Sequence, residues 1–171
     1  MKISLLEPIG VSQAVLDELS QGLKDRGHEF CYYDTKTTDV EELKKRTAGC
    51  DIAMIANNPY PAEVVESADA LKMISVAFTG IDHIGVQACR DKNIMICNAA
   101  GYSNQTVAEL VIGMAIAGLR NVAKANDVVR KGGTSAGIGG REICGRTVGI
   151  IGLGKIGMVA AKLFLAFGAK V

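Results

Sequence analysis

The chain has 171 residues, 49% of them hydrophobic and 22% charged, and a formal net charge of +1 at pH 7. This balance predicts a globular protein and argues against a disordered one, and no Lys/Arg cluster is dense enough to favour nucleic acid or an anionic membrane as a partner. The five cysteines have no C-x-x-C spacing, so we expect free thiols in the cytoplasm, with neither a disulfide framework nor a metal site.

Strands and helices alternate through the first hundred residues. Thr38-Asp39-Val40-Glu41 has the pattern of a capping box that opens the second helix. The strands are apolar and rich in β-branched residues, which predicts right-handed crossovers and a parallel sheet covered on both faces. Residues 1–100 are therefore predicted to form a flavodoxin-like α/β domain. The predicted strands are 3–6, 29–33, 51–56, 72–78 and 94–97, and the predicted helices are 12–26, 38–48, a short one that Pro61 begins, and 84–91.

The pattern changes after residues 98–101, which we interpret as the boundary between two domains. Ser103 is a candidate cap for one long helix over 104–131, whose first part is apolar and small nearly all round. Such a helix is buried or lies at an interface. Its longest apolar stretch, 110–119, falls well short of the ~20 residues that a membrane span needs. Residues 132–140 contain five glycines and are predicted to form a loop.

The most informative motif follows a predicted buried strand, 146–151. Gly152-Leu153-Gly154-Lys155-Ile156-Gly157 has the pattern G-x-G-x-x-G and leads into an amphipathic helix that Gly168 ends, with a further strand beginning at Ala169. In such a turn the first glycine allows the tight exit from the strand, the second lets a pyrophosphate approach the backbone, and the third lets the helix pack closely. The helix N-terminus offers free N–H groups to the phosphates. We predict a dinucleotide-binding turn at the start of a Rossmann domain, residues 101–171.

The same motif leaves the choice of dinucleotide open. The acidic side chain that distinguishes NAD from NADP is expected about 20 residues after the first glycine, and counted from Gly152 that position lies just beyond Val171. The motif therefore does not distinguish NAD from NADP.

Four blocks stand in order along the sequence: Ala77-Phe78-Thr79-Gly80-Ile81-Asp82, Asn98-Ala99-Ala100-Gly101-Tyr102-Ser103, Thr106-Val107-Ala108-Glu109 and 145–157. Together they resemble the D-isomer-specific 2-hydroxyacid dehydrogenases, and the resemblance covers the whole chain but only about the first half of a family member. It implies a substrate domain and a Rossmann domain that flank a cleft, NAD as the usual cofactor, and a homodimer formed through the Rossmann domain. The helix predicted over 104–131 and the loop after it resemble the parts that form the dimer contact.

The resemblance also implies roles for particular residues. Backbone N–H groups of Thr79-Gly80-Ile81 would bind the carboxylate of a 2-oxo acid, Tyr102 would contact substrate, and Thr106 would lie near the nicotinamide and phosphates. Simpler interpretations stand beside these: a plain β-α turn, a hinge aromatic and a first-turn threonine. The cofactor-binding set is completed by Gly152, Leu153, Gly154, Lys155, Ile156 and Gly157, where the family often has Arg instead of Lys.

The family's catalytic Arg, Glu and His match no residue of this sequence, because they come from the half of the family pattern that lies beyond it. His28 and His83 do not match the acid/base position, and the neighbouring side chains of Asp82 and His83 point apart on an extended segment. We therefore expect the 171-residue chain alone to show no turnover and to bind NADH poorly. We also expect either self-association or disorder at the apolar stripe 156–167, which is only partly covered.

Two other classes of function remain open. One is a non-catalytic NAD-binding sensor or partner-binding module on the same scaffold. The other is an independent receiver-like or flavodoxin-like domain. A receiver needs paired acidic residues at the end of the first strand, where only Glu7 is present, and a flavodoxin needs a phosphate-binding loop there, for which the acidic Glu7 is unsuited. Two departures, Ala100 where members often have Pro and the absence of Trp, affect only the choice of subfamily.

Overall fold

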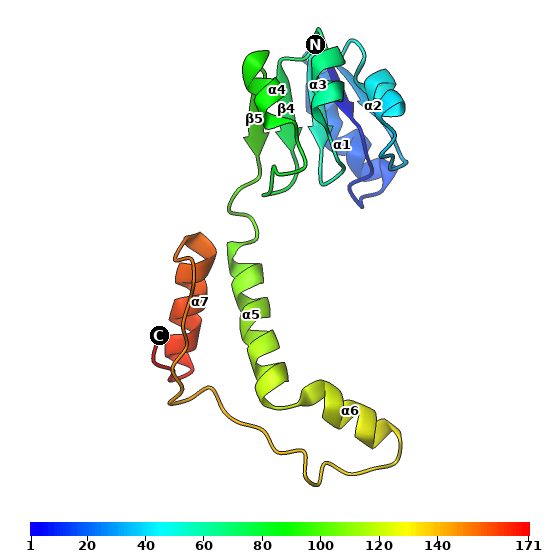
Figure 1. Ribbon diagram of the computed structural model, residues 1–171. Helices are drawn as coiled ribbons and strands as arrows, with labels where there is room; N and C mark the ends of the chain where they lie inside the picture. Colours follow the sequence, from blue (N-terminus) through cyan, green and yellow to red (C-terminus); the bar gives the residue numbers. More distant parts are fainter. The chain divides into compact units, whose positions relative to one another are not determined.

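The computed structural model describes residues 1–171, which divide into two compact units, 1–100 and 101–171. Unit 1 contains one parallel sheet and four helices (Figure 1). Its strands are β1 (Lys2–Leu5), β2 (Glu29–Tyr32), β3 (Ile52–Ile55), β4 (Met73–Val76) and β5 (Met95–Asn98), and its helices are α1 (Gln13–Lys24), α2 (Val40–Thr47), α3 (Ala62–Ser67) and α4 (Val86–Asp91).

The strand order is β2-β1-β3-β4-β5, and every neighbouring pair is parallel. This is the flavodoxin-like order, so the predicted fold class of unit 1 is confirmed. The order reverses between β1 and β3, because the chain leaves β1 toward one side and returns to place β3 on the other. The carboxyl ends of all five strands meet at one edge of the sheet, and the loops at that edge carry the candidate site.

One face of the sheet carries the main core. Side chains alternate along each strand, so Leu6, Ile55 and Ile74 share one face and are almost fully buried. Helices α2, α3 and α4 cover this face through apolar residues that belong to the same buried cluster. Tyr60 is fully buried there, and its hydroxyl lies 3.0 Å from Oγ1 of Thr47 on α2.

The opposite face is only partly covered. Helix α1 lies over β1 and β2, where Leu16 is buried near Leu5 and Phe30. No second helix covers the part of this face that β5 contributes, and there Met95 is 61% exposed and Cys97 is also exposed. Helices therefore lie on both faces of the sheet, but within residues 1–100 the single helix on this face, α1, leaves the β5 side uncovered.

The helix starts show how side chains decide the ends of elements. Ser12, predicted to be the first residue of this helix, is instead the N-cap residue of α1, and its Oγ accepts a hydrogen bond from the Val15 N–H at 3.5 Å. The capping box predicted at 38–41 is wrong, because the Asp39 carboxylate accepts from the Glu42 N–H at 2.7 Å and so starts α2 one residue later. Pro61 is the N-cap residue of α3 and not its first helical residue.

In unit 2 the single helix predicted over 104–131 is wrong. The structure has α5 (Asn104–Leu119) and α6 (Val122–Arg130), which are bent by 57° at the break. Asn121 lies between them in the left-handed region with φ 53°, and its Nδ2 donates to the Gly139 carbonyl at 2.6 Å. Asparagine tolerates this conformation, which ends the helix. No single helix meets the length and composition of a membrane span, and only the bent α5–α6 pair taken together does.

The rest of unit 2 packs α7 (Lys155–Ala166) against α5 around Ile112, Ile143, Phe164 and Ala169. The strand predicted over 146–151 forms only an isolated parallel bridge, Thr147 to Lys170. The Val148 N–H donates to the Lys170 carbonyl, and the Lys170 N–H donates to the Arg146 carbonyl, each at 2.7 Å. A regular ladder needs further extended neighbours, and within unit 2 only the segment at Lys170 lies beside this one.

Candidate functional site

The glycine motif forms a tight turn that leads directly into α7. Gly152 has φ 96°, a conformation that L side chains rarely adopt, so glycine is required where the chain leaves the extended segment. Gly154 is the N-cap residue, and the helix begins at Lys155. The extended-to-helix turn predicted from the motif is therefore present, although the segment before it is not a regular strand.

The two other glycines of the motif serve different needs. A Cβ at Gly157 would collide with the carbonyl oxygen of Gly152, so this position must remain without a side chain for α7 to approach the turn. A Cβ at Gly154 would meet no atom within 4 Å. The space beside Gly154 is therefore open, which is the room that a pyrophosphate needs next to the backbone.

The start of α7 is suited to an anion. No side chain caps this helix, so the N–H groups of its first turn are available, and the helix dipole adds partial positive charge. Lys155 in the first turn is exposed and adds a cation. Leu153 is 63% exposed, whereas Ile156 is half-buried. These residues fit the pyrophosphate of a dinucleotide.

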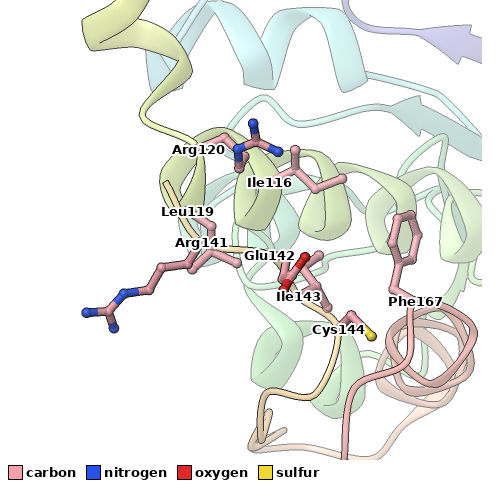
Figure 2. A pocket seen from close by; sticks show the side chains of 8 residues that line it. All are labelled: Ile116, Leu119, Arg120, Arg141, Glu142, Ile143, Cys144 and Phe167. Atoms are coloured by element: carbon pink, nitrogen blue, oxygen red, sulfur yellow. The ribbon is translucent and has the colours of Figure 1, made fainter. Parts of the chain in front are cut away.

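Unit 2 also has apolar cavities. One of about 440 Å³ lies against the turn, with Val111, Gly152, Gly157 and Phe164 among its lining residues. Another, of about 230 Å³, lies between the end of α5, residues 141–144 and Phe167, and the Arg141 side chain extends away from it (Figure 2). This second cavity includes no residue of the glycine motif, so it is not part of the candidate dinucleotide site.

In unit 1 the predicted substrate loop, Thr79-Gly80-Ile81, follows β4 at the carboxyl edge of the sheet. Asn98, the last residue of β5, donates from Nδ2 to the Thr79 carbonyl at 2.7 Å. In a trans peptide the Gly80 N–H points opposite to that carbonyl, so Asn98 fixes the direction in which this N–H points. Sequence reasoning assigned no role to Asn98, although it lies in one of the family blocks.

The remaining predicted site residues belong to unit 2. Tyr102 precedes α5 and is 63% exposed, and Thr106 is exposed in the first turn of that helix. Neither side chain makes a hydrogen bond within the chain, so both are free to contact a ligand. Ser103 is the N-cap residue of α5 by position, but its side chain makes no cap hydrogen bond.

The two histidines occupy different places in unit 1. His28 lies at the amino edge of the sheet, where its Nδ1 is 3.4 Å from the amino terminus, and this edge is opposite the substrate loop. His83 is half-buried, its Nε2 has no hydrogen-bond partner, and its carbonyl accepts from the Tyr60 N–H.

A parallel α/β sheet of flavodoxin-like order and a glycine turn at a helix N-terminus are together typical of nucleotide-binding α/β proteins. The profile of the D-isomer specific 2-hydroxyacid dehydrogenase catalytic domain matches residues 3–165. The chain belongs to this family.

Individual relatives agree with this assignment. A hydroxypyruvate reductase of Thermotoga maritima is 35% identical over 135 residues, which are 78% of this chain and 44% of that protein. Among solved structures, an acyclic imino acid reductase in complex with NADPH and D-Arg is 30% identical with a TM-score of 0.86, over 100% of this chain and 55% of that one. The NAD-dependent formate dehydrogenase of Staphylococcus aureus in complex with NAD is 27% identical with a TM-score of 0.84, over 99% and 54%. The chain thus spans about half the length of these relatives.

Proposed function

We propose that this chain is the front half of an NAD-dependent D-2-hydroxyacid dehydrogenase, which transfers hydride between NAD(H) and a small D-2-hydroxy acid or 2-oxo acid. The observation that carries the proposal is the turn at 152–157, where an open approach at Gly154 meets the uncapped start of α7. Family membership adds the reaction class. Of the two similar structures described above, one contains NADPH and the other NAD, so NADP remains an alternative cofactor.

On this proposal each unit has a binding task. The N–H groups at the start of α7 hold the pyrophosphate, with Lys155 as a nearby cation and Thr106 toward the nicotinamide. The N–H groups of Thr79-Gly80-Ile81 hold the substrate carboxylate. Asn98 orients the Gly80 N–H for this, because it holds the carbonyl of the same peptide through a hydrogen bond. Tyr102 contacts the substrate. When bound, the nicotinamide supplies the hydride, and an Arg, a Glu and a His from outside these residues supply acid/base chemistry and orientation.

We further propose a cytoplasmic homodimer that forms through residues 104–131 and the loop after them. Supporting this, Leu110 and Met114 on α5 are 60% and 65% exposed, and α6 buries none of its residues within the chain. Exposed apolar side chains on one helix are typical of an interface.

The direct test is to sequence the source gene past codon 171. The proposal predicts an acidic residue within the next few positions, followed at increasing distance by an Arg, a Glu and a late His. A continuation without these three, or a stop codon, would mean that the turn serves binding only. The 171-residue chain with NADH and a 2-oxo acid is expected to show no turnover. Robust turnover would contradict the proposal that an Arg, a Glu and a His from outside these residues are needed for catalysis.

A further inference from the structure

A crevice opens at the carboxyl edge of the unit 1 sheet, where the strand order reverses between β1 and β3. This reversal is where open α/β sheets bind ligands. The crevice has a volume of about 500 Å³, and two of its lining residues, Ala77 and Phe78, directly precede Thr79 of the substrate loop. The other lining residues are Pro8, Ile9, Gly10, Lys36, Ala56 and Asn57.

A buried carboxylate lies behind the wall of this crevice. Glu7 follows β1 and is fully buried, and its Oε1 accepts hydrogen bonds from the N–H groups of Ala56 and Asn58 at 2.7 and 2.9 Å. Its Oε2 has no hydrogen-bond partner and lies 3.6 Å from Nζ of Lys36. The ammonium of Lys36 thus balances the charge of Glu7 but does not form a hydrogen bond with it.

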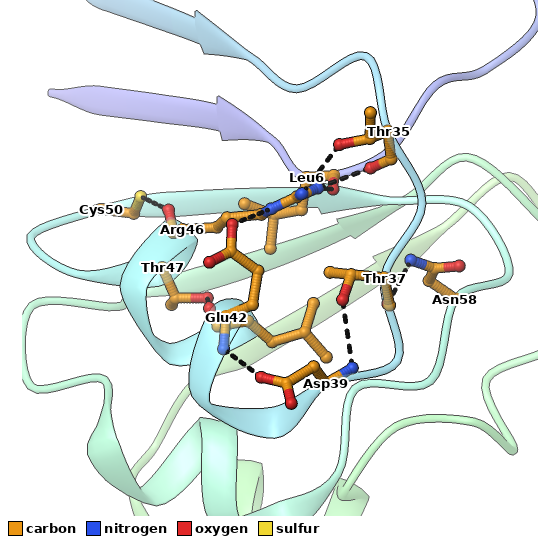
Figure 3. Close-up of polar contacts among 10 residues, drawn as sticks. Leu6, Thr35, Thr37, Asp39, Glu42, Arg46, Thr47, Cys50 and Asn58 are labelled. Atoms are coloured by element: carbon orange, nitrogen blue, oxygen red, sulfur yellow. Dashed lines mark hydrogen bonds and ion pairs between the residues drawn. The ribbon is translucent and has the colours of Figure 1, made fainter.

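The segment that carries Lys36 is held on both sides. Arg46 donates to the Thr35 carbonyl at 2.6 Å, and Asn58 donates from Nδ2 to the Thr37 carbonyl at 2.9 Å (Figure 3). Lys36 itself donates to Oδ1 of Asn57 at 3.2 Å, yet its side chain is 56% exposed. A lysine ammonium has further N–H donors, so one remains free at the crevice.

We propose that this crevice binds the C3 substituent of the 2-oxo acid and selects an uncharged hydroxyl-bearing substituent, with Lys36 as the hydrogen-bond donor and Asn57 beside it. The inference rests on the proposed function, because the substrate carboxylate must lie on Thr79-Gly80-Ile81 for its C3 to reach Ala77 and Phe78. A phosphorylated or carboxylated substituent is disfavoured, since Glu7 cancels the one positive charge present. A substituent with only carbon and hydrogen leaves the Lys36 donor without a partner.

The test is an NMR titration of the ¹⁵N-labelled 171-residue chain with pyruvate, hydroxypyruvate and 3-phosphohydroxypyruvate, followed through the amide signals of residues 56–57 and 77–81. Hydroxypyruvate should bind about tenfold more tightly than pyruvate, the size of one hydrogen bond to a charged group, and the phosphorylated acid should bind no more tightly than pyruvate. Lys36→Met should reduce hydroxypyruvate to the affinity of pyruvate. Lys44→Met, which removes a partly exposed lysine of α2 that does not line the crevice, is the control and should change neither.

The outcomes separate the two proposals. If pyruvate shifts residues 79–81 but hydroxypyruvate binds no more tightly, or Lys36→Met changes nothing, the crevice assignment is overturned and the substrate loop stands. If no 2-oxo acid shifts residues 79–81, the proposed function loses its substrate site and the crevice assignment falls with it. Glu7→Gln gives an independent check, because it leaves Lys36 uncompensated and should turn the preference toward the phosphorylated acid, whereas an unchanged preference in a folded variant would contradict the assignment.

Discussion

The α carbon of Gly157 lies so close to the carbonyl oxygen of Gly152 that a side chain at position 157 would collide with it. The first and last glycines of the motif can therefore pack this closely only because Gly157 has no Cβ. We expect Gly157→Ala to lower the free energy of unfolding of unit 2 by about 2 kcal/mol, as overpacking against backbone does. Thermal unfolding followed by circular dichroism measures this. Gly113→Ala is the control, because Gly113 is exposed on α5 with nothing within 4 Å of a Cβ, and it should not destabilise.

The buried Arg46 is expected to matter more for stability than any exposed ion pair. Its guanidinium donates to the carbonyls of Leu6 and Thr35 and to Oγ1 of Thr35, and joins Glu42 (Figure 3). Arg46→Met leaves these acceptors without a donor, so the free energy of unfolding should fall by about 3 kcal/mol in a urea titration. A fall no larger than that of Lys44→Met, which breaks an exposed pair on the same helix, would show that the network contributes little.

Tyr60 is expected to make stability fall at alkaline pH. Burial raises the pKa of the Tyr60 hydroxyl well above its usual range. The phenol then stays neutral in the folded chain, whereas it ionises at about pH 10 when unfolded, so its contribution is complete below that pH and is lost as the pH rises further. Tyr60→Phe should abolish this part of the pH dependence.

At neutral pH the same Tyr60→Phe variant should cost about 1 kcal/mol, the value of the hydrogen bond with Thr47. Thr47 keeps its own acceptor, because its Oγ1 also donates to the Leu43 carbonyl at 2.8 Å. A phenolate absorbance titration of the wild type minus that of the variant isolates Tyr60. Ionisation of Tyr60 at its ordinary pH in the folded protein would contradict this account.

If the proposed dimer forms through α5, substitutions on the exposed apolar face of that helix should change the molar mass of the protein in solution. Leu110→Glu combined with Met114→Glu places charges where the proposed interface is apolar, so light scattering should show a monomer where the wild type is a dimer. Leu19→Glu changes an equally exposed leucine, 70% accessible on α1, and should leave the mass unchanged. A monomeric wild type would remove the dimer from the proposal.

The sheet of unit 1 could be predicted from sequence because its signals are local. Apolar strands alternate with amphipathic helices, which predicts parallel strands joined by right-handed crossovers. The break at Asn121 could not be predicted, since this residue adopts its left-handed conformation with a partner, Gly139, that is 18 residues away. The strand before Gly152 was predicted from an apolar run, but a ladder depends on neighbouring segments and not on its own sequence.

The candidate site divides in the same way. The roles of Gly152 and Gly157 could be predicted from spacing, because each glycine solves a steric problem within a few residues. The contact between Asn98 and Thr79 depends on the pairing of β4 with β5, and the approach of Lys36 to Glu7 depends on the pairing of β1 with β2. Both contacts join residues far apart in sequence, so residue type alone gave no indication of them.

The dinucleotide site is tested by comparing NADH binding to the wild-type chain and to Gly154→Ala through amide chemical shifts. Gly154 has an ordinary φ of −76° and open space around it, so alanine should leave the fold unchanged. In the wild type NADH should shift the amides of residues 152–158, even where binding is weak, and in Gly154→Ala these shifts should disappear because the methyl group occupies the path of the pyrophosphate. Equal shifts in both chains, or shifts confined to other residues, would contradict the assignment of this turn as the dinucleotide site.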